Sequence, residues 1–193
     1  MAARAAIEHA RAERLAAECR AHRPLLEELA TVGLEVESVW DLLSLSEPCP
    51  AALPILIEHL EHATYPSRVM EGIGRSLAVK PAVQYWDRLI ACYRHATDDG
   101  AREGAAVALD ACVTKQQIGD LITLTRDRHP SDELPIYFLQ RIMRLGGDEG
   151  RSFVASLVDD PVLGGEATAL TRRATKKAGG QRHQEAAFDP QRP

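Results

Sequence analysis

Two histidines lie three residues apart, each next to a glutamate, in a stretch whose composition predicts a helix. Glu58 precedes His59, and Glu61 precedes His62. Because residues three apart share one side of a helix, this stretch could present two imidazoles and a carboxylate to a metal ion. The His-Glu-x-x-His pattern of zinc enzymes is absent, and a solvated polar face explains the same four residues. We therefore expect neither a metal site nor another cofactor.

The cysteines are scattered along the chain without a C-x-x-C pair, at Cys19, Cys49, Cys92 and Cys112. A chain of 193 residues needs no disulfide framework, so we expect reduced thiols and a cytoplasmic location. Cys92 and Cys112 fall at predicted core positions, where a thiol behaves as a small hydrophobic group and not as a nucleophile.

Motifs of common enzyme classes are also missing. The sequence contains no G-x-S-x-G elbow, no ordered Ser, His and Asp set, no phosphate-binding glycine loop and no dinucleotide fingerprint. We therefore predict a non-catalytic protein without an evident small-molecule substrate.

The composition indicates the fold class of the protein. Hydrophobic residues make up 45% of the chain and charged residues 26%, which suits a folded domain with a sizeable core. Aromatic residues are only 5%, while alanine and leucine recur throughout. Helices that pack through small aliphatic side chains fit this composition better than sheets. The sequence predicts an all-α fold.

Charge is distributed unevenly. The chain has 23 basic and 28 acidic residues, yet residues 171–193 carry a net charge of +4 and residues 1–170 carry −9. Such an acidic body would repel a phosphate backbone, so we do not expect a general nucleic-acid-binding protein. The longest stretch without a charged residue, Pro48 to Ile57, has ten residues, and a bilayer needs about 20. We expect no membrane-spanning helix.

Apolar residues recur along the chain at a step of 32. Ile57, Leu89, Leu121 and Phe153 are separated by this interval. Each period reads as two amphipathic helices around a turn, and the turns contain proline, aspartate or glycine at residues 65–67, 97–100, 129–131 and 159–161. Four helical hairpins in series are therefore predicted over residues 51–176, with Asp160 as a helix cap.

Segments of different character flank these hairpins. Residues 1–50 contain a polar helix over 3–22, a second segment that opens at Pro24, and a short helix that Ser38 can cap. We interpret this region as an N-terminal helical cap over the first hairpin. Residues 177–193 are polar and contain glycine, which predicts a disordered basic tail.

Helix pairs of this length resemble HEAT repeats and the related HEAT-like repeats of bilin-lyase-type proteins. The stretch from Asp99 to Leu109 follows the pattern of the family's second helix, with aspartate, a turn residue, a small residue, arginine, paired alanines and a final Ala-Leu. Asp160 to Leu170 is a second copy. The resemblance covers about residues 51–172 and implies a right-handed α-α superhelix, that is, a short solenoid.

One enzyme class with a HEAT-like fold provides the alternative function. Alkylpurine DNA glycosylases of this type hold a damaged base with aromatic side chains and a carboxylate in a basic groove. The candidate aromatic residues here are Trp40, Tyr65, Tyr85, Trp86 and Tyr93. Core packing is the commoner role for Trp86 and Tyr93, and the acidic body lacks the basic groove.

In a solenoid of hairpins the second helices line the concave face, so their polar residues are the predicted contact surface. These residues are Arg68, Glu71, Arg75, Arg102, Glu103, Asp110, Arg141 and Arg144. Charges of mixed sign with prominent arginines suit a protein partner better than a polyanion. The sequence thus predicts a protein-binding scaffold, adaptor, regulator or immunity-type protein, although ordinary solvated charges would give the same pattern.

Overall fold

The regular structure of the protein is helical. A computed structural model describes residues 2–62 and 64–187, and within these ranges it contains helices and no strand. The predicted all-α class is confirmed. The chain divides into two compact units, residues 1–112 and 113–193, and this division falls between the second and third predicted hairpins.

The N-terminal part of the first unit consists of helices that precede the hairpins. These are α1 (Ala2–Ala21), α2 (Arg23–Thr31), η1 (Val39–Ser44) and η2 (Pro50–Ala52). Ser38 begins η1 as predicted, because its hydroxyl accepts a hydrogen bond from the Trp40 amide while the Asp41 carboxylate accepts one from the Ser38 amide. This reciprocal pair satisfies two amides that the helix leaves unpaired.

Four helix pairs follow at the predicted positions. They are α3 (Leu53–His62) with α4 (Ser67–Ser76), α5 (Trp86–His95) with α6 (Asp99–Cys112), α7 (Ile118–Arg126) with α8 (Ile136–Leu145), and α9 (Gly147–Ser156) with α10 (Gly164–Ala187). Short 3-10 helices, η3 (Lys80–Tyr85) and η4 (Lys115–Gln117), precede α5 and α7. Residues 177–187, predicted as tail, continue α10, and residues 188–193 lie outside the described residues.

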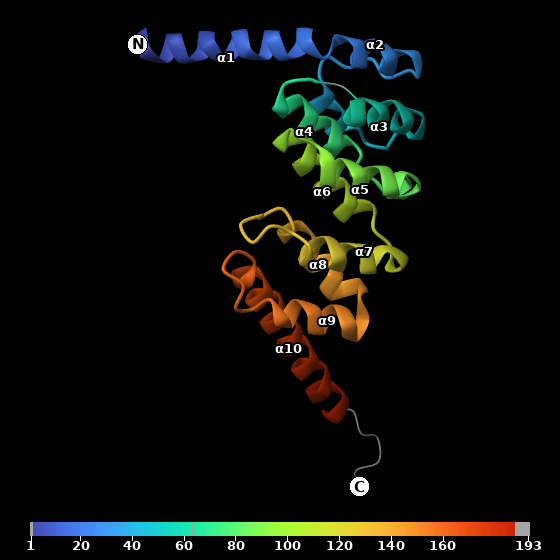
Figure 1. The fold of residues 1–193 in the computed structure, drawn as a ribbon, viewed down its shortest axis with the longest axis vertical. Helices are drawn as coiled ribbons and strands as arrows, with labels where there is room; N and C mark the ends of the chain where they lie inside the picture. The colour runs from blue at the N-terminus through green and yellow to red at the C-terminus, as the bar shows by residue number, and fades with distance from the viewer. Residues whose placement is uncertain (1, 63, 188–193) are drawn as a thin grey trace. The chain divides into compact units, whose positions relative to one another are not determined.

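Within each unit, equivalent helices of consecutive pairs pack together. In the first unit α3 contacts α5 and α4 contacts α6, and Figure 1 shows these two pairs as stacked layers. In the second unit α7 contacts α9 and α8 contacts α10. Residues 32 apart occupy equivalent positions in consecutive pairs, and Ile57, Leu89 and Leu121 are all fully buried. The 32-residue step therefore explains why equivalent helices pack on one another. In α9 the buried position moves from Phe153 to Val154.

Glycines set the closest helix contact of the first unit. A Cβ atom placed on Gly104 of α6 would lie 2.8 Å from the Gly74 Cα atom of α4. One placed on Gly72, which precedes Gly104 by 32 residues, would lie 2.7 Å from the Val39 side chain of η1. Thus the position on α4 that contacts η1 is equivalent to the position on α6 that contacts α4.

A turn residue of one pair also contacts the turn of the next. The Ser67 hydroxyl donates to Asp98 Oδ1 (3.2 Å) and accepts from the Gly100 amide (3.0 Å). Asp98 Oδ1 accepts a further hydrogen bond from the Ala101 amide (2.8 Å), and so caps α6. This contact ties the start of α4 to the start of α6.

The second unit repeats this link with charged groups. Arg128, after α7, donates to Asp160 of the turn before α10. The other carboxylate oxygen of Asp160 accepts hydrogen bonds from the Val162 and Leu163 amides, at 2.9 and 2.8 Å. Asp160 therefore caps the turn that leads into α10, although α10 itself begins at Gly164.

Candidate functional site

Six of the eight predicted contact residues lie on α4 and α6 of the first unit, and Arg141 and Arg144 lie on α8 of the second. The half-buried Trp40 of η1 adjoins the six residues of the first unit, because the Arg68 guanidinium lies over the Trp40 ring, 5.0 Å from its centroid. We call this group the α4–α6 face, which comprises Trp40, Arg68, Glu71, Arg75, Arg102, Glu103 and Asp110.

Arg75 is the central cation of the α4–α6 face. Its Nε atom donates to Glu71 Oε1 on the same helix (2.6 Å), and its Nη2 atom donates to Glu103 Oε1 on α6 (2.8 Å). All three side chains are 24–34% exposed. Partial burial and two partners hold the guanidinium in one orientation, whereas an isolated surface arginine would sample many rotamers.

Aromatic rings hold the two outer arginines. Arg68 is 63% exposed, lies over Trp40 and is 3.8 Å from a carboxylate oxygen of Glu18. Arg102 lies over Tyr93, 5.6 Å from the ring centroid, and its Nε atom donates to the Tyr93 carbonyl at 3.3 Å. Each cation-π contact contributes about 0.5–1 kcal/mol at an exposed site. Each arginine of the α4–α6 face thus has a side-chain partner, and carboxylates lie among them.

A second ionic cluster joins the first helices, α3 and α5. Arg88 donates to Glu58 at 3.0 Å and to Glu61 at 2.9 Å. His62 lies 3.5 Å from Glu58, and the ligand atoms of Glu58, Glu61 and His62 are within 4.8 Å of one another. Both carboxylates, however, already bind the Arg88 guanidinium, which supplies the positive charge that a metal ion would otherwise bring.

The two histidines considered for a metal site are separated in the structure. His59 turns away from His62 toward α2, where its Nε2 atom lies 3.2 Å from a carboxylate oxygen of Glu28. Its Nδ1 atom lies 2.8 Å from the Tyr65 hydroxyl, and the two rings stack. The two imidazoles that this spacing could have presented together therefore lie in different surroundings. Burial raises the pKa of Tyr65, and the charge of Glu28 adds to this effect.

The other aromatic and thiol side chains mostly belong to the core, as predicted. Trp86 and Tyr93 are 6% and 4% exposed. Cys92 and Cys112 are buried free thiols, and burial raises the pKa of each to about 11. Such thiols are inert at neutral pH.

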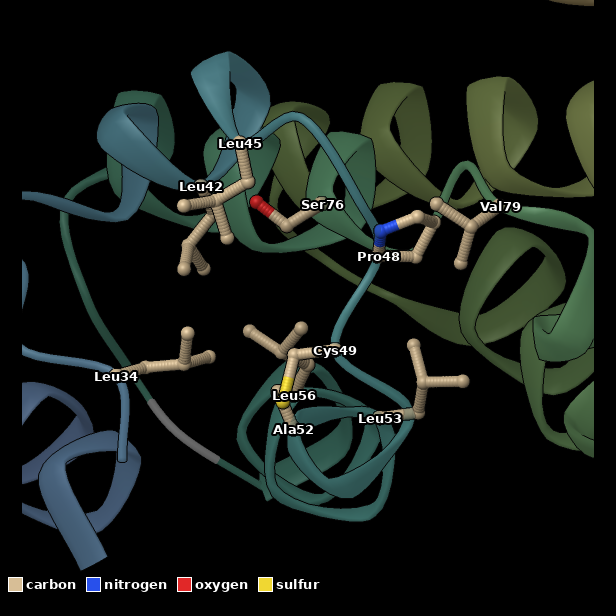
Figure 2. Close-up of a pocket in the computed structure, with 10 residues that line it drawn as sticks. All are labelled: Leu34, Leu42, Leu45, Pro48, Cys49, Ala52, Leu53, Leu56, Ser76 and Val79. Carbon is tan, nitrogen blue, oxygen red and sulfur yellow. The ribbon is translucent and has the colours of Figure 1, made fainter. Parts of the chain in front are cut away.

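An apolar cavity that sequence reasoning missed lies between η1, the start of α3 and α4 (Figure 2). Its volume is about 40 Å³, and its lining residues are Leu34, Leu42, Leu45, Pro48, Cys49, Ala52, Leu53, Leu56, Ser76 and Val79. The Ser76 hydroxyl already donates to the Gly72 carbonyl at 2.8 Å. Binding sites for drug-sized ligands usually measure about 300–1,000 Å³, so this cavity does not by itself indicate a substrate site.

Comparison with known proteins adds no function to this geometry: no family model, no curated protein and no solved structure matches the chain. Among the described residues, no helix is both long and apolar enough to cross a bilayer.

Proposed function

We propose that the chain is a non-catalytic HEAT-like solenoid, with a right-handed superhelical course, that binds another protein through the α4–α6 face. It would act as an adaptor, a regulator or an immunity-type partner. Stacking of equivalent helices within each unit supports the solenoid. Its free thiols Cys49, Cys92 and Cys112 suit a reducing compartment such as the cytoplasm.

The partnered arginines of the α4–α6 face are the observation that carries this proposal. Arg75 is held by two carboxylates, and Arg68 and Arg102 lie over aromatic rings. Groups fixed before binding lose less conformational entropy when a partner docks. Arginine and tryptophan are also enriched among the residues that dominate protein interfaces.

The charge pattern of the same face favours a protein over a nucleic acid. The acidic residues Glu71, Glu103 and Asp110 equal the arginines in number, so the face has no net excess of positive charge. A phosphate backbone would be repelled by these carboxylates, whereas a folded protein can place its own cations opposite them. This pattern also disfavours the glycosylase function for the α4–α6 face.

Charge reversal of the outer arginines tests the proposal. The double variant Arg68→Glu, Arg102→Glu leaves Arg75 and its two carboxylate partners in place. Reversing Arg75 itself would put a carboxylate beside Glu71 and Glu103 and destabilise the fold. The partner would be captured from the source cell with tagged wild-type protein, identified by mass spectrometry and purified. We expect the double variant to bind it at least tenfold more weakly in calorimetry, while circular dichroism shows that it remains folded.

Arg94→Glu provides the control, because Arg94 is exposed near the end of α5 in the same unit. Arg88 cannot serve this purpose, since its reversal would break the contacts with Glu58 and Glu61. Equal weakening by the double variant and by the control, or by neither, would show that the α4–α6 face is not the binding surface.

A further inference from the structure

The C-terminal helix carries a cluster of basic side chains that the proposed protein-binding face does not use. Arg172, Arg173 and Lys176 are exposed on α10. Successive residues of a helix are rotated by 100°, so these three fall within one third of its circumference. The buried residues Ala167 and Leu170 lie on the opposite side. We call the three cations the α10 basic face, and it points away from the core of the second unit.

Three other basic side chains of the second unit have partners. Arg128 binds Asp160, Arg151 binds Asp148, and Arg126 lies over the Phe153 ring. The α10 basic face makes no ion pair or hydrogen bond to another described residue. Three neighbouring like charges without a counter-charge attract anions more strongly than neutralised pairs do.

The division into units explains how such a face can exist in an acidic chain. Residues 1–112 contain 11 basic and 17 acidic residues, whereas residues 113–193 contain 12 basic and 11 acidic residues. The negative charge of the protein therefore belongs to the first unit. Because charges are screened beyond about 8–10 Å at physiological salt, the local cluster on α10 decides what binds there.

We propose that the α10 basic face binds the phosphate backbone of a nucleic acid without regard to sequence. Arg172 to Lys176 span about 6 Å along the helix axis, and one strand of a duplex places a phosphate every 3.4 Å or so. The cations can therefore engage neighbouring phosphates. Arginine guanidinium groups also match phosphate geometry with two hydrogen bonds each.

Other anionic partners fit this face less well. A helix that binds a membrane surface needs large apolar side chains beside its basic ones, whereas the described neighbours of these cations are Ala169, Thr171, Ala174 and Thr175. A protein interface needs a buried aromatic or aliphatic anchor at its centre, and the α10 basic face has none. Nucleic-acid backbones are bound through charge and counterion release alone.

The salt dependence of duplex binding tests this proposal in the full-length protein. The probe is a fluorescein-labelled 20-base-pair DNA of arbitrary sequence, and its anisotropy is titrated between 50 and 200 mM salt. We expect the triple variant Arg172→Gln, Arg173→Gln, Lys176→Gln to bind at least tenfold more weakly than wild type. Loss of up to three phosphate contacts should reduce the slope of log K against log salt by about 2 to 3.

A matched triple variant separates a local site from overall charge. Lys115→Gln, Arg94→Gln and Arg20→Gln remove the same charge from other exposed positions, and this variant should bind DNA like wild type. The proposal is overturned by undetectable wild-type binding at 50 mM salt, by equal losses in both triple variants, or by an unchanged slope. It is also overturned if phosphatidylserine vesicles or polyglutamate bind the wild type as tightly as the duplex.

Discussion

Gly74 and Gly104 face each other between α4 and α6, so closely that neither position has room for a side chain. A Cβ atom on Gly104 would meet the Gly74 Cα at 2.8 Å and the Glu71 carbonyl oxygen at 2.9 Å. Both contacts are to backbone atoms, which cannot rotate away as a side chain could. This approach sets the distance between the two helices that carry most of the α4–α6 face.

We predict that Gly104→Ala destabilises the protein, because the added methyl group forces α4 and α6 apart. Alanine normally stabilises a helix relative to glycine by about 0.5–1 kcal/mol. Overpacking of a close contact costs about 1–3 kcal/mol, so the net change in unfolding free energy should be a loss. Urea denaturation monitored by circular dichroism would measure it.

Gly119→Ala on α7 is the matched control, because a Cβ atom added at Gly119 would have no packing neighbour within 4 Å. Here helix propensity acts alone, and we expect a gain of about 0.5–1 kcal/mol. Opposite signs for the two substitutions would support the close contact; a gain from both would contradict it.

The hydrophobic step of 32 residues also predicts stability effects. Leu89 is fully buried on α5, and Leu89→Ala should reduce the unfolding free energy by about 2–5 kcal/mol. Leu43→Ala on η1 should cost far less, since Leu43 is 46% exposed. Equal destabilisation by the two substitutions, measured by urea denaturation, would mean that the 32-residue period does not mark core positions.

Much of the architecture can be predicted from sequence because its determinants are local. Apolar residues such as Ile57 and Leu89 recur at one interval, and turn residues such as Pro66 and Asp160 stand between the helices. Each helix therefore follows from a short window of sequence. No comparable local sequence pattern marks the boundary between the two units after Cys112.

Individual contacts of the candidate site are less predictable, because they join residues far apart in sequence. Arg75 binds Glu103 of the next hairpin, 28 residues away, and His59 reaches Glu28 on α2. Residues at i and i+3, such as His59 and His62, are about 60° apart around a helix. Neighbouring helices can therefore direct them to different surroundings, as they do for these two histidines.

Thiol reactivity should distinguish the cysteines. Burial raises the pKa of Cys92 and Cys112 to about 11, so at pH 8 only about one thiol in a thousand is ionised. Cys49 is half-buried beside the small cavity and should be alkylated first among these three. Iodoacetamide labelling of the folded protein, followed by peptide mass spectrometry, would check this order. Modification of Cys112 before Cys49 would contradict the burial of the Cys112 thiol.

The contact between Arg128 and Asp160 predicts a specific pH dependence. The Leu163 amide, which donates a hydrogen bond to the carboxylate, is the main cause that lowers the pKa of Asp160, and the charge of Arg128 lowers it further. A carboxyl whose pKa is lower in the folded state stabilises the protein above its unfolded pKa, near 4. That stability is lost as the pH falls through the lower, folded value.

Asp160→Asn keeps an oxygen that can cap the turn but removes the charge that binds Arg128. We expect it to cost about 1–2 kcal/mol at pH 7, and the difference from wild type should shrink toward zero below pH 4. Urea denaturation between pH 7 and pH 2 would measure this difference. Asp148→Asn serves as the control, because Asp148 pairs with Arg151 while 99% exposed, and surface pairs contribute little. A difference for Asp160→Asn that stays constant across this pH range would show that the charge of Asp160 does not stabilise the fold.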